Sequence, residues 1–251
     1  MRFLRESYIV FWRQLRMNLR NPAWVIIGLL QPILYLLLFG PLLKPLAKQF
    51  GYDNEFTFLV PGLLVQLGVF GAFFAGFSLI GEWREGVIEA ERVTPASRTA
   101  LLMGRLWRDL LQLFVQALIL VVLGYFMGMR APFGGIVVGL LLTLLIGGAC
   151  AAASNALAMA TKSEDVMAPV INMVMMPVLL LSGILLPMTL GPKWLLHASD
   201  FMPIRHIVDA VRGSFVGDVA GSTLLAGTFW SVLLCGLAVW WGTSTFRKED
   251  A

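Results

Sequence analysis

The chain has 251 residues, of which 58% are hydrophobic and only 14% charged, and its formal net charge is +4. A soluble domain carries nearer a quarter charged residues because water must solvate its surface, so this composition excludes an ordinary globular protein. The basic excess is typical of the cytoplasmic face of a membrane protein, and we expect no nucleic-acid partner. The charges gather between long apolar stretches. This pattern predicts an all-α integral membrane protein with a single transmembrane domain over residues 1–251.

Residues 1–22 are predicted to form an amphipathic helix in the cytoplasmic interface. Apolar residues recur at three- or four-residue spacing from Leu4 to Leu19, and arginines accompany them. A helix with one apolar face and flanking arginines lies in the plane of the membrane surface. A simple topogenic anchor fits this pattern as well as a mechanical role does.

Six segments are apolar and long enough to cross about 30 Å of hydrocarbon, which takes about 20 helical residues. They are residues 23–43, 58–80, 98–127, 134–160, 167–186 and 224–246. With the N-terminus inside, 13 of the 19 Lys and Arg residues fall on the inner side and 6 on the outer side. This bias predicts that both termini are cytoplasmic. Small residues over 147–154 favour close helix packing within the chain, with a subunit interface as the alternative.

The loop after the second span is predicted to hold a short amphipathic helix over residues 84–93. Pro95 disfavours a helical conformation at Thr94, so this helix must end there, and Ser97 can cap the next one. An apolar patch edged by charges suits docking to a partner, whereas a solvated charged loop is the alternative. The candidate docking residues are Arg84, Glu85, Val87, Ile88, Glu89 and Arg92.

The segment over residues 187–213 is predicted to lie across the outer leaflet as short helices. Pro187 breaks the fifth span, and Gly213 is expected to end the last of these helices. Large apolar side chains beside charged ones suit a helix that dips partly into the leaflet. The candidate residues of this outer cap are Pro187, Trp194, Pro203, Asp209 and Arg212.

The middle of every span is free of Asp, Glu, Lys, Arg and His. Gradient-driven carriers usually place an ionisable group near the bilayer centre and are built from inverted repeats. A secondary carrier or channel is therefore the weaker alternative. Gln31, Gln66 and Asn172 are candidate pathway residues, although hydrogen bonding between helices is the commoner role of such amides.

We find neither a catalytic or metal-binding set of residues nor a G-x-x-x-x-G-K-[ST] phosphate loop. A membrane-embedded enzyme therefore has no supporting residues, and we expect no cofactor in this chain. If the protein is an active transporter, its energy comes from a partner.

The chain resembles the permease subunit of type 2 ABC exporters, the group that contains daunorubicin-type drug-efflux and polysaccharide-export permeases. The likeness is carried by REGVIEAERVTPASRTALLMGRLWRDLL at residues 84–111 and LSGILLPMTLGPKWLLHASDFMPIRHIVDAVRG at residues 181–213. The second stretch closes on the pattern D-A-x-R-G that ends at Gly213. It departs from the family at Met202, where Asn before the proline is common.

The resemblance implies that two permeases, identical or related, pair around a central pathway in the lipid bilayer. Each would contact a separately encoded ATPase that binds ATP and Mg²⁺. Residues 84–93 would be the coupling helix, residues 1–20 the connecting helix beside it, and residues 187–213 a cap on the pathway. It also implies export of an amphiphilic substrate (a drug, a lipid or a lipid-linked glycan) across a bacterial cell membrane.

Overall fold

The computed structural model describes residues 2–20, 23–49, 52, 54–92 and 97–248, and within these ranges the chain is helical and has no strands. The elements are α1 (Arg2–Arg20), α2 (Ala23–Gln49), α3 (Glu55–Phe73), α4 (Ala75–Arg84), α5 (Val87–Arg92), α6 (Arg98–Phe126), α7 (Phe133–Thr161), α8 (Glu164–Leu181), the 3₁₀ turn η1 (Met188–Leu190), α9 (Lys193–Asp200), α10 (Pro203–Phe215) and α11 (Ser222–Lys248). Six segments are long and apolar enough to cross a membrane, with α3 and α4 counted together. The predicted all-α fold with six candidate spans is thus confirmed.

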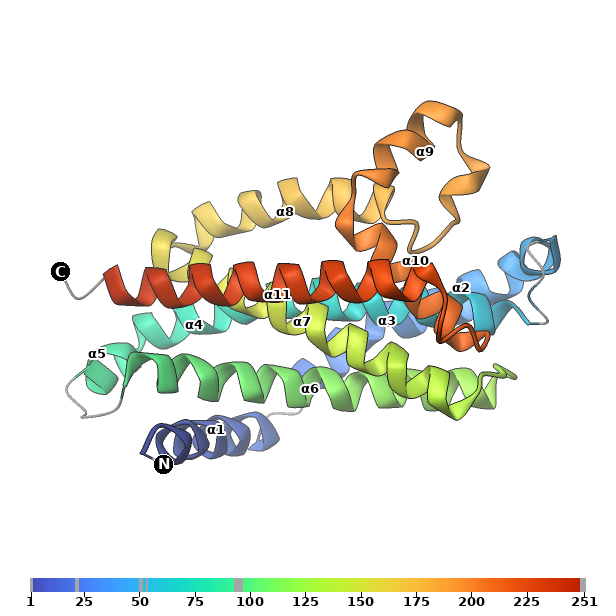
Figure 1. Ribbon diagram of the computed structural model, residues 1–251. Coiled ribbons are helices and arrows are strands. Elements are labelled where there is room, and N and C mark those ends of the chain that lie inside the picture. The colour runs from blue at the N-terminus through green and yellow to red at the C-terminus, as the bar shows by residue number, and fades with distance from the viewer. Residues whose placement is uncertain (1, 21–22, 50–51, 53, 93–96, 249–251) are drawn as a thin grey trace.

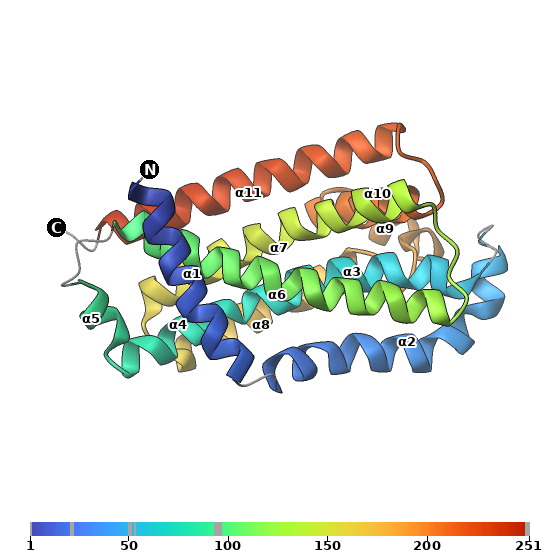
Figure 2. The ribbon, with the colours of Figure 1, turned by 90° about the horizontal axis from the view of Figure 1, so that it is seen from below.

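The spanning helices run roughly along one axis, and α1 crosses them obliquely at one end (Figures 1 and 2). The helix α5 and the last turns of α11 lie at this end, which we call the α1 end. The helices α9 and α10 lie toward the opposite end, which we call the α9 end (Figure 1). The start of α1 and the end of α11 therefore share one end of the bundle, as an even number of spans requires.

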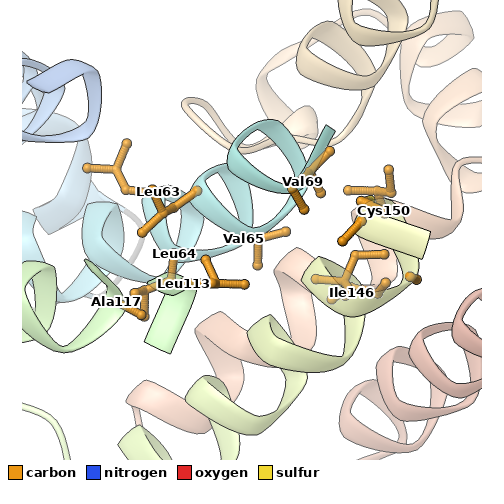
Figure 3. Packing of buried hydrophobic residues seen from close by; sticks show 14 of the residues in the cluster. Leu63, Leu64, Val65, Val69, Leu113, Ala117, Ile146 and Cys150 are labelled. Atoms are coloured by element: carbon orange, nitrogen blue, oxygen red, sulfur yellow. The ribbon is translucent and has the colours of Figure 1, made fainter. Parts of the chain in front are cut away.

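The helix α3 forms the centre of the bundle and packs against α2, α6, α7 and α10. It is apolar on nearly every side, and a helix of that kind is buried rather than amphipathic. Figure 3 shows its side chains meeting those of α6 and α7. The labelled residues of this contact are Leu63, Leu64, Val65, Val69, Leu113, Ala117, Ile146 and Cys150, and all are buried.

The second span is two helices rather than the single helix expected over residues 58–80. The break lies at Phe74, between α3 and α4. The hydroxyl of Ser154 on α7 donates to the carbonyl oxygen of Phe73 and accepts a hydrogen bond from the N–H of Gly76 at 3.0 Å. Because lipid offers no hydrogen bonds, backbone groups freed by a break must be satisfied within the protein. Ser154 satisfies both of these backbone groups. The close packing expected for residues 147–154 therefore includes at least one contact within the chain.

Other boundaries also differ from those predicted. The helix α2 continues to Gln49, whereas the first span was expected to end at residue 43. The fifth span ends at Leu181 rather than at residue 186, and Gly183 two residues later has φ +72°. The loop helix begins at Val87 rather than at residue 84, because Gly86, with φ +74°, separates it from α4. Glycine adopts a positive φ at little cost, since it has no Cβ to collide with the backbone.

Candidate functional site

The helix α1 packs against α6 with an unusual distribution of side chains. Ser7 and Gln14 are buried, whereas Leu4 and Ile9 are about 60% exposed. Gly104 of α6 permits the close approach, since a Cβ there would lie 2.8 Å from the carbonyl oxygen of Ser7. A helix that buries polar groups and exposes apolar ones suits a lipid surface, as predicted for residues 1–22.

Beneath α1 lies a set of charged and polar side chains, which we call the α1-end network: Gln14, Ser78, Glu82, Arg105, Arg108 and Asp109. Four of them are buried, whereas Asp109 is half-buried and Ser78 is exposed. Arg105 donates to one carboxylate oxygen of Glu82 through Nε at 3.1 Å and Nη2 at 2.7 Å. Gln14 of α1 donates to the other oxygen of Glu82 at 2.8 Å. Arg108 donates to the side-chain oxygen of Gln14 at 3.1 Å and to Oδ1 of Asp109 at 2.6 Å. The network therefore joins α1, α4 and α6 by charge-assisted hydrogen bonds.

The α1-end network was missed by the sequence analysis, which treated Arg105 and Arg108 only as markers of the inner side. In the structure Arg105 is 2% and Arg108 6% exposed. A buried charge is costly unless it is paired and hydrogen-bonded. The sequence feature that could have predicted this network is a pair of arginines three residues apart, on one helical face, at the start of an apolar span. A carboxylate, Glu82, stands at the end of the preceding span.

The predicted docking residues are divided between the surface and the interior. Arg84 and Glu85 are exposed, and Arg84 forms an ion pair with Glu164 of α8 at 3.1 Å. Val87 is half-buried, and Ile88 is 7% exposed and part of the hydrophobic core. The expected apolar patch of this helix is therefore turned partly inward. The side chains of Glu89 and Arg92 lie outside the described residues.

One of the outer-cap residues, Arg212 of α10, is a buried cation. Its Nη2 atom donates to the carbonyl oxygen of Ile184 at 2.7 Å, and its guanidinium lies 4.3 Å from the ring centroid of Phe58. Gly62 of α3 allows this contact, because a Cβ there would collide with the same Ile184 oxygen. Arg212 therefore holds the segment after α8 against α3, at the centre of the bundle.

The other predicted cap residues have more ordinary positions. Pro187 precedes η1, Pro203 is the first residue of α10, and Trp194 is 70% exposed. Asp209 lies one helical turn from Arg205, with 3.6 Å between the carboxylate and Nε. The expected end of α10 at Gly213 is wrong. The helix continues to Phe215, and Gly217 with φ +93° takes the left-handed position beyond it.

Burial shifts the acid–base properties of this cap. Desolvation raises the pKa of Asp209, and the nearby Arg212 and Arg205 oppose that shift. Desolvation likewise lowers the pKa of Arg212, an effect that Asp209 opposes. Both shifts arise because burial disfavours the charged form of each group.

The three pathway candidates are not gathered into one site. Gln66 is 1% exposed in α3, and its amide has no hydrogen-bond partner among the described residues. Gln31 is exposed on α2, where it donates to the hydroxyl of Tyr35 at 3.3 Å. Asn172 is exposed on α8. Only the last two therefore face outward, where a second chain or a pathway could reach them.

A cavity of about 730 Å³ lies at the α1 end, and none of the three pathway candidates lines it. Its wall is contributed by α1, α3, α4, α6 and α7, and it includes Glu85 and Glu164 from the neighbouring α4–α5 and α8 segments. No group of three or more His, Cys, Asp or Glu side chains within the described ranges could hold a metal ion. The α1 end therefore combines the hydrogen-bonded α1-end network with a neighbouring cavity.

Comparison with known proteins fits this architecture. Residues 5–216 match the family model described as ABC-2 type transporter. The chain is 27% identical over 214 residues to ycf38 of Cyanophora paradoxa, named as a transport permease, with 84% of this chain and 74% of that protein covered. It is 24% identical over 229 residues to ycf38 of Pyropia yezoensis, covering 89% and 75%.

A further relative is YbhR of Escherichia coli K12, named as a multidrug ABC transporter permease. It is 25% identical over 179 residues, which cover 70% of this chain and 48% of YbhR. The family match runs from α1 through α10 and includes the α1-end network and the outer cap. The chain therefore belongs to the ABC-2 type transporter family and is a multi-pass membrane permease subunit of an ABC transporter.

Proposed function

We propose that this permease is half of an ATP-driven exporter for an amphiphilic substrate such as a drug, a lipid or a lipid-linked glycan. A second copy or a related chain completes the pathway, and a separate ATPase that binds ATP and Mg²⁺ drives it. The complex lies in a bacterial cell membrane with both termini cytoplasmic. The observation that carries this proposal is the α1-end network, which joins α1 to the helices on both sides of α5.

The α4–α5–α6 segment has features that suit a docking site for the ATPase. The exposed pair Arg84 and Glu85 precedes α5, and Gly86 separates that short helix from α4. A displacement of α5 would act on α4 directly and on α8 through the ion pair between Arg84 and Glu164. It would act on α1 and α6 through Glu82. A partner bound here could therefore move several spans together.

The outward faces of α2 and α8 are the best candidates for the pathway. In Figure 1 α8 stands apart from α11, and only 22% of the residues in its apolar, membrane-spanning stretch are buried. α11 is even less buried, at 11%, but its exposed face carries large apolar residues such as Trp240 and Phe229. The helices α2 and α8 expose large apolar residues too, but they also expose the amides Gln31 and Asn172. We therefore assign α11 to lipid, and α2 and α8 to the pathway and the second permease.

The docking assignment can be tested by co-expressing the permease with its candidate ABC ATPase. We expect Glu85→Arg to abolish co-purification of the ATPase, together with vanadate-sensitive transport. The matched control is Asp218→Arg, which reverses an exposed charge in the loop before α11. Normal assembly of the Glu85 variant would contradict the docking site. Substrate flux driven by an ion gradient in ATP-free liposomes would contradict the exporter itself.

A further inference from the structure

The helix α1 carries three rows of side chains that point in different directions around its axis. Successive residues of an α-helix are rotated by about 100°. The first row is buried against the bundle and comprises Ser7, Val10 and Gln14. The second is apolar and exposed and comprises Leu4, Tyr8, Trp12 and Leu19. The third, which we call the arginine row, is exposed and comprises Arg5, Arg16 and Arg20. Because Arg5 follows Leu4 and Arg20 follows Leu19, the arginine row borders the apolar row.

The aromatic residues of α1 indicate its depth in a bilayer. Because α1 crosses the spanning helices obliquely (Figure 2), it runs along a membrane surface rather than through it. Tyr8 and Trp12 stack with their ring centroids 6.4 Å apart, and the guanidinium of Arg16 lies 5.5 Å from the ring centroid of Trp12. Trp and Tyr gather at the boundary between hydrocarbon and water. With Trp12 at this boundary, Arg16 lies at the level of the lipid headgroups.

The arginine row has no carboxylate to balance it within the part of the chain that the structure describes. None of the ion pairs there includes Arg5, Arg16 or Arg20. Glu6, the only acidic residue in the sequence of α1, accepts a hydrogen bond from the N–H of Ser97 at 3.0 Å. Arg16 and Arg20 are one helical turn apart, and like charges at that spacing repel each other. An anion bound between them would replace this repulsion by attraction.

We infer that the arginine row binds the phosphate groups of anionic phospholipids while the apolar row lies among their acyl chains. A guanidinium holds two oxygens of one phosphate at once. Phosphatidylcholine also has a phosphate, but its own ammonium competes with the arginine, so a lipid with net negative charge binds better. This selectivity does not depend on the exporter assignment. Only its placement in the cytoplasmic leaflet, whose surface is negative, rests on the proposed function.

The test measures how strongly lipids with brominated acyl chains quench the fluorescence of Trp12. The full chain is placed in phosphatidylcholine nanodiscs that contain a minor, varied share of brominated phosphatidylglycerol or of phosphatidylcholine with the same brominated chains. Subtracting the signal of Trp12→Phe isolates Trp12 from the other tryptophans. One arginine near an anionic surface contributes a factor of about five in affinity. We therefore expect phosphatidylglycerol to be enriched at Trp12 by about fivefold or more over phosphatidylcholine.

Two perturbations separate the arginine row from the rest of the chain. The combined variant Arg5→Gln, Arg16→Gln and Arg20→Gln should remove the enrichment, and glutamine has a helix propensity close to that of arginine. The matched control removes the same charge from three exposed cations outside α1, by Lys44→Gln, Arg130→Gln and Lys193→Gln. This control should keep the enrichment at Trp12. Salt at about 1 M shortens the screening length to about 3 Å, so it should abolish most of the enrichment in the native chain.

Equal quenching of Trp12 by the two brominated lipids would overturn the inference. So would an enrichment that survives the three glutamines or high salt, or one that the control variant loses equally. The salt measurement uses the native chain, so it decides the matter if the glutamine variant does not fold. An acidic surface of the ATPase is the other partner that such a row could meet. Loss of ATPase co-purification in the glutamine variant, without any lipid enrichment in the native chain, would assign the row to that protein and overturn the inference. The nanodiscs contain no ATPase, so failure of the exporter assignment would leave the lipid result unchanged.

Discussion

Replacing Glu82 with alanine removes the central acceptor of the α1-end network. Arg105, 2% exposed, then loses both of its hydrogen bonds to Glu82, and Gln14 of α1 loses its acceptor. Breaking a buried ion pair from one side costs about 3–5 kcal/mol, because the remaining charge loses the carboxylate that compensated its burial. For a chain of this size a loss of 1 kcal/mol lowers Tm by about 2–4 °C. We therefore expect Tm to fall by roughly 6–20 °C.

The assay follows reaction of a thiol-reactive fluorophore with Cys150 during heating. This cysteine is 7% exposed in the core, so it reacts only when the bundle opens. Cys235 is half-exposed and should first be replaced by serine. Arg84→Ala is the matched control, because its pair with Glu164 is 60% and 40% exposed and such surface pairs contribute about 1 kcal/mol or less.

A double variant separates the contribution of charge to stability from that of packing. Glu82→Leu combined with Arg105→Met replaces the ion pair by apolar groups, and such replacements are often neutral or stabilising. We expect it to recover most of the Tm that Glu82→Ala loses. If Glu82→Ala costs no more than Arg84→Ala, the buried pair does not stabilise the bundle more than an exposed pair does.

Three further predictions concern the centre and the outer cap. Gly62→Ala places a Cβ against the Ile184 carbonyl that Arg212 binds, so we expect a loss of about 1–3 kcal/mol from overpacking, measured as a lower Tm; an unchanged Tm would show that the cap is not held against α3. Ser154→Ala leaves the Phe73 carbonyl and the Gly76 N–H without their partner. We expect it to cost about 1–3 kcal/mol, whereas Thr243→Ala, which removes only bonds within α11, should have a smaller effect. Burial raises the pKa of Asp209, so the folded cap favours its protonated form and this residue's contribution to stability falls as pH rises through that pKa. Relative to the native chain, Asp209→Asn should therefore have a higher Tm at pH 7 and lose that advantage near pH 4; a constant difference across this range would contradict the assigned pKa direction.

Several features of this protein follow from local sequence. A stretch of about 20 apolar residues crosses a membrane whatever its neighbours are, so the six spans could be predicted. Ser97 was predicted to cap the third span, and its hydroxyl accepts a hydrogen bond from the N–H of Ala100 at 3.3 Å. Caps and spans depend only on residues that are close together in the sequence, so they can be predicted from it.

The break at Phe74 and the inward position of Ile88 were not predictable in the same way. The break depends on Ser154, about 80 residues further along the chain. The side chain of Ile88 is buried because of the surfaces that surround α5, whereas its own helix has only six residues. A short amphipathic segment does not by itself indicate which of its faces a neighbouring element will cover.

The sequence by itself determined the number of spans, the positions of the charged segments and the basic excess that suggests their orientation. Only the tertiary structure decided that Glu82 pairs with Arg105, that Gln14 reaches both Glu82 and Arg108, and that Arg108 donates both of its hydrogen bonds with Asp109 to the same oxygen. Hydropathy is a property of each segment, and it acts wherever that segment lies in the bilayer. The pairing of charges depends on which helical faces meet, and some of these contacts join residues 68 to 94 positions apart.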